Sequence, residues 1–154
     1  MFGFLEETMK KKAGSFVPLT RAPSVCVATP SHPLAAKKAL SQKDLKAGSM
    51  IICDPHHSTP ALSSLTASII GARPLKELYF CDNQTCALTL IKAGLGFSIL
   101  PDIIPVRDPE LCYIPVEGLP SLSFGLYYKK LGTHPALKDF VEIMKEEFKK
   151  IPQT

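Results

Sequence analysis

The feature that most constrains the fold is a strand–turn–helix pattern that occurs twice in the middle of the chain. The apolar run 50–53 is followed by a polar turn and a helical pattern over 58–70, and the run 78–81 is followed by a polar turn and a helical pattern over 85–93. Short apolar runs are typical of buried strands, and apolar residues three or four apart are typical of one helix face. Strands that alternate with helices at this spacing favour an α/β fold with parallel strand pairs.

Local signals mark where the two helices begin and end. Ser58 or Thr59 can cap the first helix, and Asp82 or Asn83 can cap the second. Glycine follows each helix and favours its termination. After the second helix, Gly94 and Gly96 are interpreted as a helix stop and a tight return into a strand over 97–100, with close approach to a ligand as the alternative.

Further elements are expected on both sides of this pattern. We expect at most one amphipathic turn in the first 14 residues, built on Phe4, Leu5 and Met9. A possible Ser41 cap and Gly48 predict a short helix over 40–47. The remaining expected elements are two extended segments within 16–28 separated by Arg21, Ala22 and Pro23, strands over 112–116 and 122–128, and a helix from Pro135 with an apolar stripe of Leu137, Phe140, Val141, Met144 and Phe148.

Composition narrows the class of protein. A chain of 154 residues with 45% hydrophobic and 21% charged content is long enough to bury a core. The net charge of +4 comes partly from the lysine runs 10–12 and 149–150, which are interpreted as solvated ends rather than a nucleic-acid surface. With neither a membrane-length apolar stretch nor a secretion signal, a cytoplasmic protein is expected, and its five cysteines are interpreted as reduced thiols at core-like positions.

Polar residues follow both central strands and indicate a ligand site. The carboxyl ends of parallel strands meet at one sheet edge, and two helix starts there present unpaired N–H groups that favour a carboxylate or phosphate. The segments 54–59 and 82–85 are therefore the candidate ligand segments. The predicted contacts are His56, His57, Ser58, Thr59, Asn83 and Thr85.

The same residues have a structural interpretation. Ser58, Thr59 and Asn83 would cap their helices whether or not a ligand binds. Asp54 and Asp82 would also repel an anion unless they turn away or cap a helix. Both interpretations stay open at the level of sequence.

The sequence gives little support for a metal site or a catalytic site. His56 and His57 lie close to Cys53, but the spacing matches no common zinc pattern. Cys53 could act as a nucleophile beside these histidines, yet it ends an apolar run and the sequence supplies no third orienting group. Phosphate-binding and nucleophile-elbow motifs are absent from the sequence. We therefore predict no metal, no cofactor and no enzymatic activity.

The order of several short motifs is similar to that of a known family. The segment 32–35 reads His-Pro-Leu-Ala after an apolar strand, Asp44 and Leu45 precede the next strand, and the segment 90–101 reads LIKAGLGFSILP. The segment 134–137, His-Pro-Ala-Leu, begins the last helix. This ordered set resembles the effector-binding domain of LysR-type transcriptional regulators.

The resemblance implies a fold like type 2 periplasmic binding proteins, in which two α/β subdomains enclose an effector. It implies an N-terminal extension over 1–15 and a partial effector-binding domain over 16–150, divided into a second subdomain (16–121) and a closing strand and helix (122–150). It also implies that the family's effector contacts fall on the turn 56–59, and that DNA is bound only through a helix-turn-helix that this chain lacks.

The resemblance makes a small-molecule sensor of a transcriptional regulator the leading hypothesis. The expected partners are a small effector, a carboxylate by preference, and further copies of the chain in a homo-oligomer, with no membrane partner. Two alternatives are an interaction module whose segment 122–150 packs on a partner, and a cysteine-dependent enzyme around Cys53.

Overall fold

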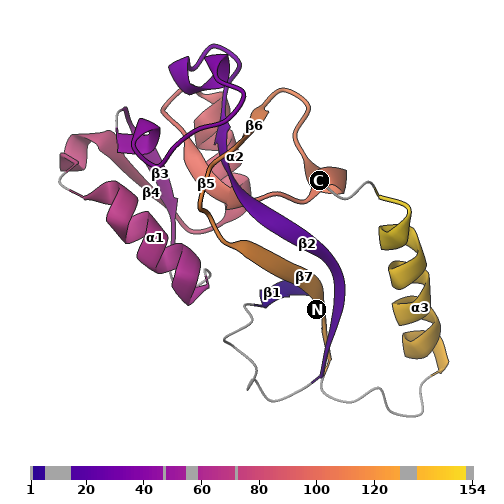
Figure 1. Cartoon of the computed structure of the whole chain (residues 1–154). Helices are drawn as coiled ribbons and strands as arrows, with labels where there is room; N and C mark the ends of the chain where they lie inside the picture. Colours follow the sequence, from indigo (N-terminus) through magenta and orange to yellow (C-terminus); the bar gives the residue numbers. More distant parts are fainter. Residues whose placement is uncertain are drawn as a thin grey trace. The chain divides into compact units, whose positions relative to one another are not determined.

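The structure is a computed structural model that describes residues 2–5, 15–46, 48–54, 59–71, 73–128 and 135–151. The helices and strands in chain order are β1 (Phe2–Leu5), β2 (Ser15–Ala28), β3 (Met50–Cys53), α1 (Pro60–Ile70), β4 (Leu78–Cys81), α2 (Gln84–Lys92), β5 (Ser98–Pro101), β6 (Cys112–Pro115), β7 (Ser121–Tyr128) and α3 (Pro135–Lys149). Figure 1 shows them along the chain. The chain divides into a terminal unit, 1–22 with 121–154, and a central unit, 23–120.

In the terminal unit, β7 lies between β1 and β2. Strand β1 pairs antiparallel with β7, from Phe2 opposite Leu126 to Leu5 opposite Ser123. The ring of Phe124 in β7 lies 5.8 Å from that of Phe148 in α3, and Phe148 is buried. This aromatic contact joins the strand β7 to the helix α3 within the unit.

The central unit contains both parallel and antiparallel strand pairs. Strand β2 pairs antiparallel with β5 and β6, while β3 and β4 are parallel, with Met50 opposite Leu78 and Cys53 opposite Cys81. Strand β3 is joined to the start of β5 because the Ile51 N–H donates to the Phe97 carbonyl at 2.8 Å. The fold class expected from sequence, a mixed and partly parallel α/β sheet flanked by helices, is confirmed.

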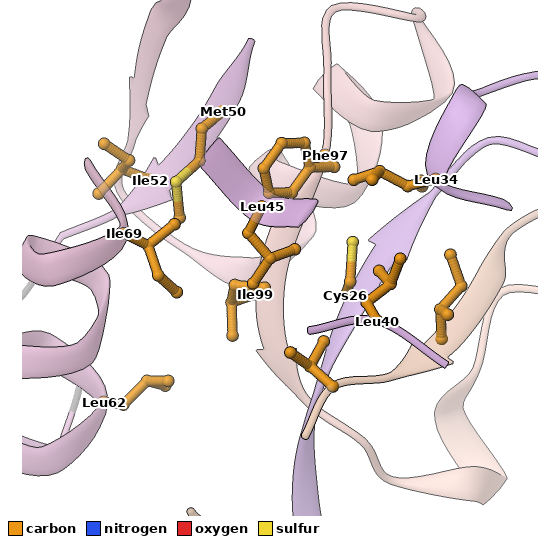
Figure 2. Close-up of a cluster of buried hydrophobic side chains, with 13 residues drawn as sticks. Cys26, Leu34, Leu40, Leu45, Met50, Ile52, Leu62, Ile69, Phe97 and Ile99 are labelled. Atoms are coloured by element: carbon orange, nitrogen blue, oxygen red, sulfur yellow. The ribbon is translucent and has the colours of Figure 1, made fainter. Parts of the chain in front are cut away.

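Helices cover both faces of the central strands. In β3, Met50 and Ile52 belong to a buried cluster with Leu62 and Ile69 of α1, which Figure 2 shows. Ile51 between them belongs to a second cluster with Ala87 and Ile91 of α2. Since successive strand residues point to opposite faces, α1 and α2 cover opposite faces of β3. This double coverage explains why the strands read as unbroken apolar runs.

Gly96 lies where the β3–β4 pair meets the sheet that contains β2 and β5. Its φ of 153° is a conformation that other residues rarely adopt, and a Cβ here would lie 2.2 Å from the Ser49 carbonyl oxygen. The close backbone approach lets Phe97 N–H bond to that carbonyl at 3.2 Å. The structural interpretation of Gly96 made from sequence therefore accounts for this glycine.

Several sequence predictions are wrong. Phe4 and Leu5 lie in a strand rather than a helical turn, because β7 supplies a pairing partner; Met9 lies outside the described residues. The segment 16–28 forms one strand, β2, because its first part pairs within the terminal unit and its second part with β5 and β6.

The predicted helix over 40–47 is also wrong. Among the described residues of this segment, Asp44–Lys46 form a short 3₁₀ turn, and Leu40 bridges to Val116 instead; Ala47 lies outside the described residues. The Asp44 carboxylate accepts hydrogen bonds from the N–H and hydroxyl of Ser41 at 2.8 and 2.9 Å. This local side-chain bonding competes with helix formation.

The last helix departs from its predicted stripe at one position. Val141 and Phe148 are buried as expected, but Phe140 is 43% exposed. Among the described helices, none is long and apolar enough to cross a lipid bilayer.

Candidate functional site

The candidate site is the edge of the central unit at which β3 and β4 end. The two strands end in register at Cys53 and Cys81, and the Asp54 N–H donates to the Cys81 carbonyl at 2.9 Å, which extends their pairing by one residue. Each strand then leads to a helix start, at Pro60 in α1 and Gln84 in α2. The predicted combination of parallel strand ends followed by helix N-termini is present.

Helix α1 begins with a buried cap. Thr59 has extended backbone angles, and its Oγ1 accepts a hydrogen bond from the Leu62 N–H at 3.4 Å. Its side chain is only 7% exposed, and Pro60 occupies the first turn, where a missing N–H has no cost. The threonine hydroxyl therefore satisfies one of the N–H groups that a helix start leaves unpaired.

Helix α2 begins with an exposed cap. The Asn83 Oδ1 accepts a hydrogen bond from the Cys86 N–H at 2.9 Å, and Asn83 itself is exposed. Thr85 is also exposed, and its carbonyl accepts a hydrogen bond from the Thr89 hydroxyl at 3.0 Å. Two polar side chains of this helix start are thus open to solvent.

These observations decide one part of the sequence interpretation. Thr59 and Asn83 do cap their helices, as the structural interpretation required. Their contact with a ligand, and that of Thr85, stays a prediction. His56, His57 and Ser58 lie outside the described residues.

Two thiols meet at the same edge. The Sγ atoms of Cys53 and Cys81 are 3.7 Å apart, and Cys86 of α2 is exposed. Burial raises the pKa of the Cys53 thiol to about 12 and also raises the pKa of Cys81. Because the thiolate is the nucleophilic form, a raised pKa argues against Cys53 as a catalytic nucleophile at neutral pH.

Sequence reasoning missed this sulfur contact and placed Cys86 in the core. The available signal was that the runs 50–53 and 78–81 both end on cysteine, so that in-register pairing brings the two together. Cys86 is exposed because the buried positions of α2 are Ala87 and Ile91. Within the part of the chain that the structure describes, no three histidine, cysteine or acidic side chains gather as metal ligands.

The fold and this edge define a class of protein, the ligand-binding α/β domains whose sites lie beyond the carboxyl ends of parallel strands. Residues 4–149 match the family described as the LysR substrate binding domain. This match spans most of the chain, and the protein therefore belongs to that family, as the ordered motifs indicated.

Curated relatives are regulators in bacteria. The chain is 25% identical over 136 residues to the Hca operon transcriptional activator HcaR of Escherichia coli (strain K12), which covers 85% of this chain and 45% of the relative. It is 26% identical over 145 residues to the uncharacterized HTH-type transcriptional regulator YvbU of Bacillus subtilis (strain 168), covering 86% and 46%. The chain spans about half the length of these relatives.

Solved structures share the fold. The effector binding domain of QuiR in complex with shikimate has a TM-score of 0.65 and 21% identity, over 97% of this chain and 72% of that chain. The Synechocystis PCC6803 CcmR regulatory domain in complex with 2-PG has a TM-score of 0.66 and 18% identity, over 98% and 74%. The fold expected from the family resemblance, that of LysR-type effector-binding domains, is thereby confirmed.

Proposed function

We propose that this chain is the effector-sensing part of a LysR-type transcriptional regulator, and that it binds a small anionic metabolite, a carboxylate by preference, to control transcription. The observation that carries the proposal is the in-register pair β3 and β4, whose carboxyl ends lead to two capped helix starts at one edge. Helix N-termini favour anions through their N–H groups and dipoles. Family membership and the ligand complexes of the two related folds agree with this function.

The capping hydrogen bonds indicate which ligand groups the side chains of Thr59 and Asn83 can bind. The acceptor oxygens of Thr59 and Asn83 already receive N–H groups of their own helices. Each side chain also has a donor, the hydroxyl hydrogen of Thr59 and the amide nitrogen of Asn83, beside the second lone pair of its capping oxygen. A ligand that meets donors must itself carry acceptors, which a carboxylate does and an ammonium group does not.

We infer the contact set from both halves of the edge. Thr59, Asn83 and Thr85 belong to the two helix starts, and His56, His57 and Ser58 belong to the turn that precedes α1. Histidine and serine side chains add further hydrogen-bond donors. On this proposal the segment 16–121, which includes the central unit 23–120, corresponds to the second subdomain of the family.

The test is thermal stabilisation of the full chain by a panel of small carboxylates, each paired with its neutral amide. A ligand that binds only the folded state at one hundred times its Kd stabilises by about 2.7 kcal/mol, which raises Tm by several degrees. We expect the carboxylates to raise Tm and the amides not to. Equal stabilisation by acid and amide would contradict the anionic specificity, and no response to a broad metabolite panel would contradict effector binding.

A double variant tests whether the ligand binds at the start of α1. Ser58→Ala with Thr59→Ala should abolish the shift, although loss of the Thr59 cap also lowers the basal Tm. Ser68→Ala is the matched control, since Ser68 is exposed near the other end of α1 and bonds only locally to the Leu65 carbonyl. We expect Ser68→Ala to retain the full ligand shift.

A second candidate is an interaction module, and the observation that favours it is an apolar surface on α3. Phe140 and Ile143 are 43% and 54% exposed. Exposed apolar side chains grouped on one element mark interaction sites. We propose self-association of the chain through this surface, and a strictly monomeric sedimentation profile up to high concentration would contradict it.

A further inference from the structure

Two cysteines of the central unit occupy equivalent positions on neighbouring strands. Cys53 ends β3 and Cys81 ends β4, and they are register partners in the parallel pair. Neighbouring strands lie about 4.8 Å apart, within the range of about 4.4 to 6.8 Å that disulfides span between Cα atoms. The backbone therefore holds the two residues at a separation that a disulfide requires.

The two side chains also face the same way. Cys81 is buried in the cluster of Ile51, Ala87 and Ile91, and Cys53 packs against that same cluster. Their Sγ atoms are 3.7 Å apart, and a disulfide would bring them to about 2.05 Å. No strand has to slide or turn over for the bond to form.

A third thiol gives an oxidant access to the pair. Cys86 is exposed in the first turn of α2, and the next residue, Ala87, is buried in the same cluster as Cys81. Burial raises the pKa of the Cys81 thiol, and the nearby Cys86 contributes a smaller part of that rise. The other two cysteines belong to a different buried cluster, since Cys26 lies in the cluster that contains Leu62 and Ile69 of α1, and Cys112 packs against that cluster. Only three of the five cysteines can take part.

We propose that Cys53 and Cys81 form an oxidisable dithiol that a hydroperoxide converts to an intramolecular disulfide, with Cys86 as the thiol that the oxidant reaches first. This inference goes beyond effector binding and does not depend on it, because the bond and its readout need no ligand.

The reaction balances in three steps. The Cys86 thiolate attacks the peroxide, which breaks the O–O bond and yields a sulfenic acid and an alcohol, or water from hydrogen peroxide. The Cys81 thiolate then attacks the Cys86 sulfur and releases water. Finally the Cys53 thiolate attacks the Cys81 sulfur, and Cys86 leaves and regains its proton. Two thiols lose two electrons and two protons, and one peroxide is reduced.

The final disulfide is expected between Cys53 and Cys81 because of the leaving-group chemistry of thiols. A thiol of high pKa is a poor leaving group, so the bond that includes Cys53, with its pKa of about 12, resists further exchange. The same pKa makes the attack by Cys53 slow at neutral pH. Because the thiolate fraction rises about tenfold per pH unit below the pKa, formation of the final bond should accelerate between pH 7 and 9.

The experiment is peptide mapping of the full, unmodified chain. Dilute reduced protein is treated with hydrogen peroxide, remaining thiols are alkylated, and the protein is digested without reduction by a protease that cleaves before aspartate. Cleavage before Asp44, Asp54, Asp82 and Asp102 separates Cys53 in 44–53, Cys81 in 54–81 and Cys86 in 82–101. We expect a cross-link between 44–53 and 54–81.

Variants test the route. Cys86→Ser should slow the Cys53–Cys81 cross-link at least tenfold, and Cys112→Ser is the matched control that should leave the rate unchanged. A stable link from 54–81 to 82–101, a link between two chains, or independent oxidation of each cysteine in the unmodified protein would overturn the proposal. An unchanged rate in Cys86→Ser would overturn the role of Cys86.

Discussion

The β3–α1 and β4–α2 motifs follow the same backbone plan but differ in their surroundings. Helix α1 faces Met50 and Ile52, whereas α2 faces the other side of β3. The cap of α1, Thr59, is buried, and the cap of α2, Asn83, is exposed. The same local signals, a polar cap and an apolar helical pattern, therefore form both helices. Tertiary packing decides how much each cap and each apolar side chain contributes to the stability of the folded chain.

The largest effect should come from matched truncations in the two helices. Ile91→Ala in α2 removes a fully buried side chain, and Ile69→Ala does so near the end of α1, where Ile69 is 4% exposed. Each should lower the free energy of unfolding by about 2 to 5 kcal/mol in urea titrations. We expect Ile91→Ala to lower the free energy of unfolding more than Ile69→Ala. The reason is that the end of α1 can move to fill part of the cavity that the shortened side chain leaves. A larger loss of unfolding free energy in Ile69→Ala than in Ile91→Ala would contradict this expectation.

The glycines after α2 should give the next effect. Gly96→Ala places a Cβ 2.2 Å from the Ser49 carbonyl oxygen, so the backbone that joins β3 to β5 must shift. Overpacking of this kind costs about 1 to 3 kcal/mol. Gly94→Ala is the control, since a Cβ there meets open space and only its φ of 76° is unfavourable. If thermal unfolding shows equal losses, conformation rather than the backbone contact explains Gly96.

Substitution of the two helix caps should lower the stability by a smaller amount, and the two losses should differ. Thr59→Ala leaves the Leu62 N–H without its partner at a buried position, and Asn83→Ala leaves the Cys86 N–H where water can replace the amide. Loss of a cap costs about 0.5 to 2 kcal/mol, and we expect Thr59 near the upper end and Asn83 near the lower. Equal urea midpoints for the two variants would show that burial does not separate the caps.

The smallest effect should be a loss of stability at alkaline pH. The pKa of Cys53 is about 12 in the folded chain and close to 9 when unfolded, so the folded state binds more protons across that interval. Its contribution is complete below pH 9 and is lost as the pH rises toward 12. We expect the urea midpoint of Cys53→Ala to fall less between pH 8 and 10 than that of the unmodified chain. Parallel curves would contradict a role for Cys53.

The elements of the central motifs were predictable because their signals are local. Each cap could be narrowed to two neighbouring residues before an apolar helical pattern, and the structure shows that Thr59 and Asn83 make the capping bonds. The ordered motifs also led to the family that residues 4–149 match. The errors concern residues whose structure depends on a distant partner: Phe4 and Leu5 pair with β7, and Leu40 bridges to Val116.

The candidate site divides in the same way. The sequence predicts that 54–59 and 82–85 lie at one edge, because parallel strands align their carboxyl ends. It does not give the register of β3 and β4, since a shift of one residue moves every side chain to the other face. The contact between Cys53 and Cys81 depends on that register.

The sequence by itself determined the alternation of strands and helices, the short polar segments that contain the helix caps and the family of this protein, because each depends on residues close together in the chain or in a fixed order. The tertiary structure alone decided which face of β3 each helix covers, that Phe140 is exposed while Val141 is buried, and that two thiols meet where the strands end. These properties depend on long-range packing and strand register, and neither is encoded in a short window of sequence.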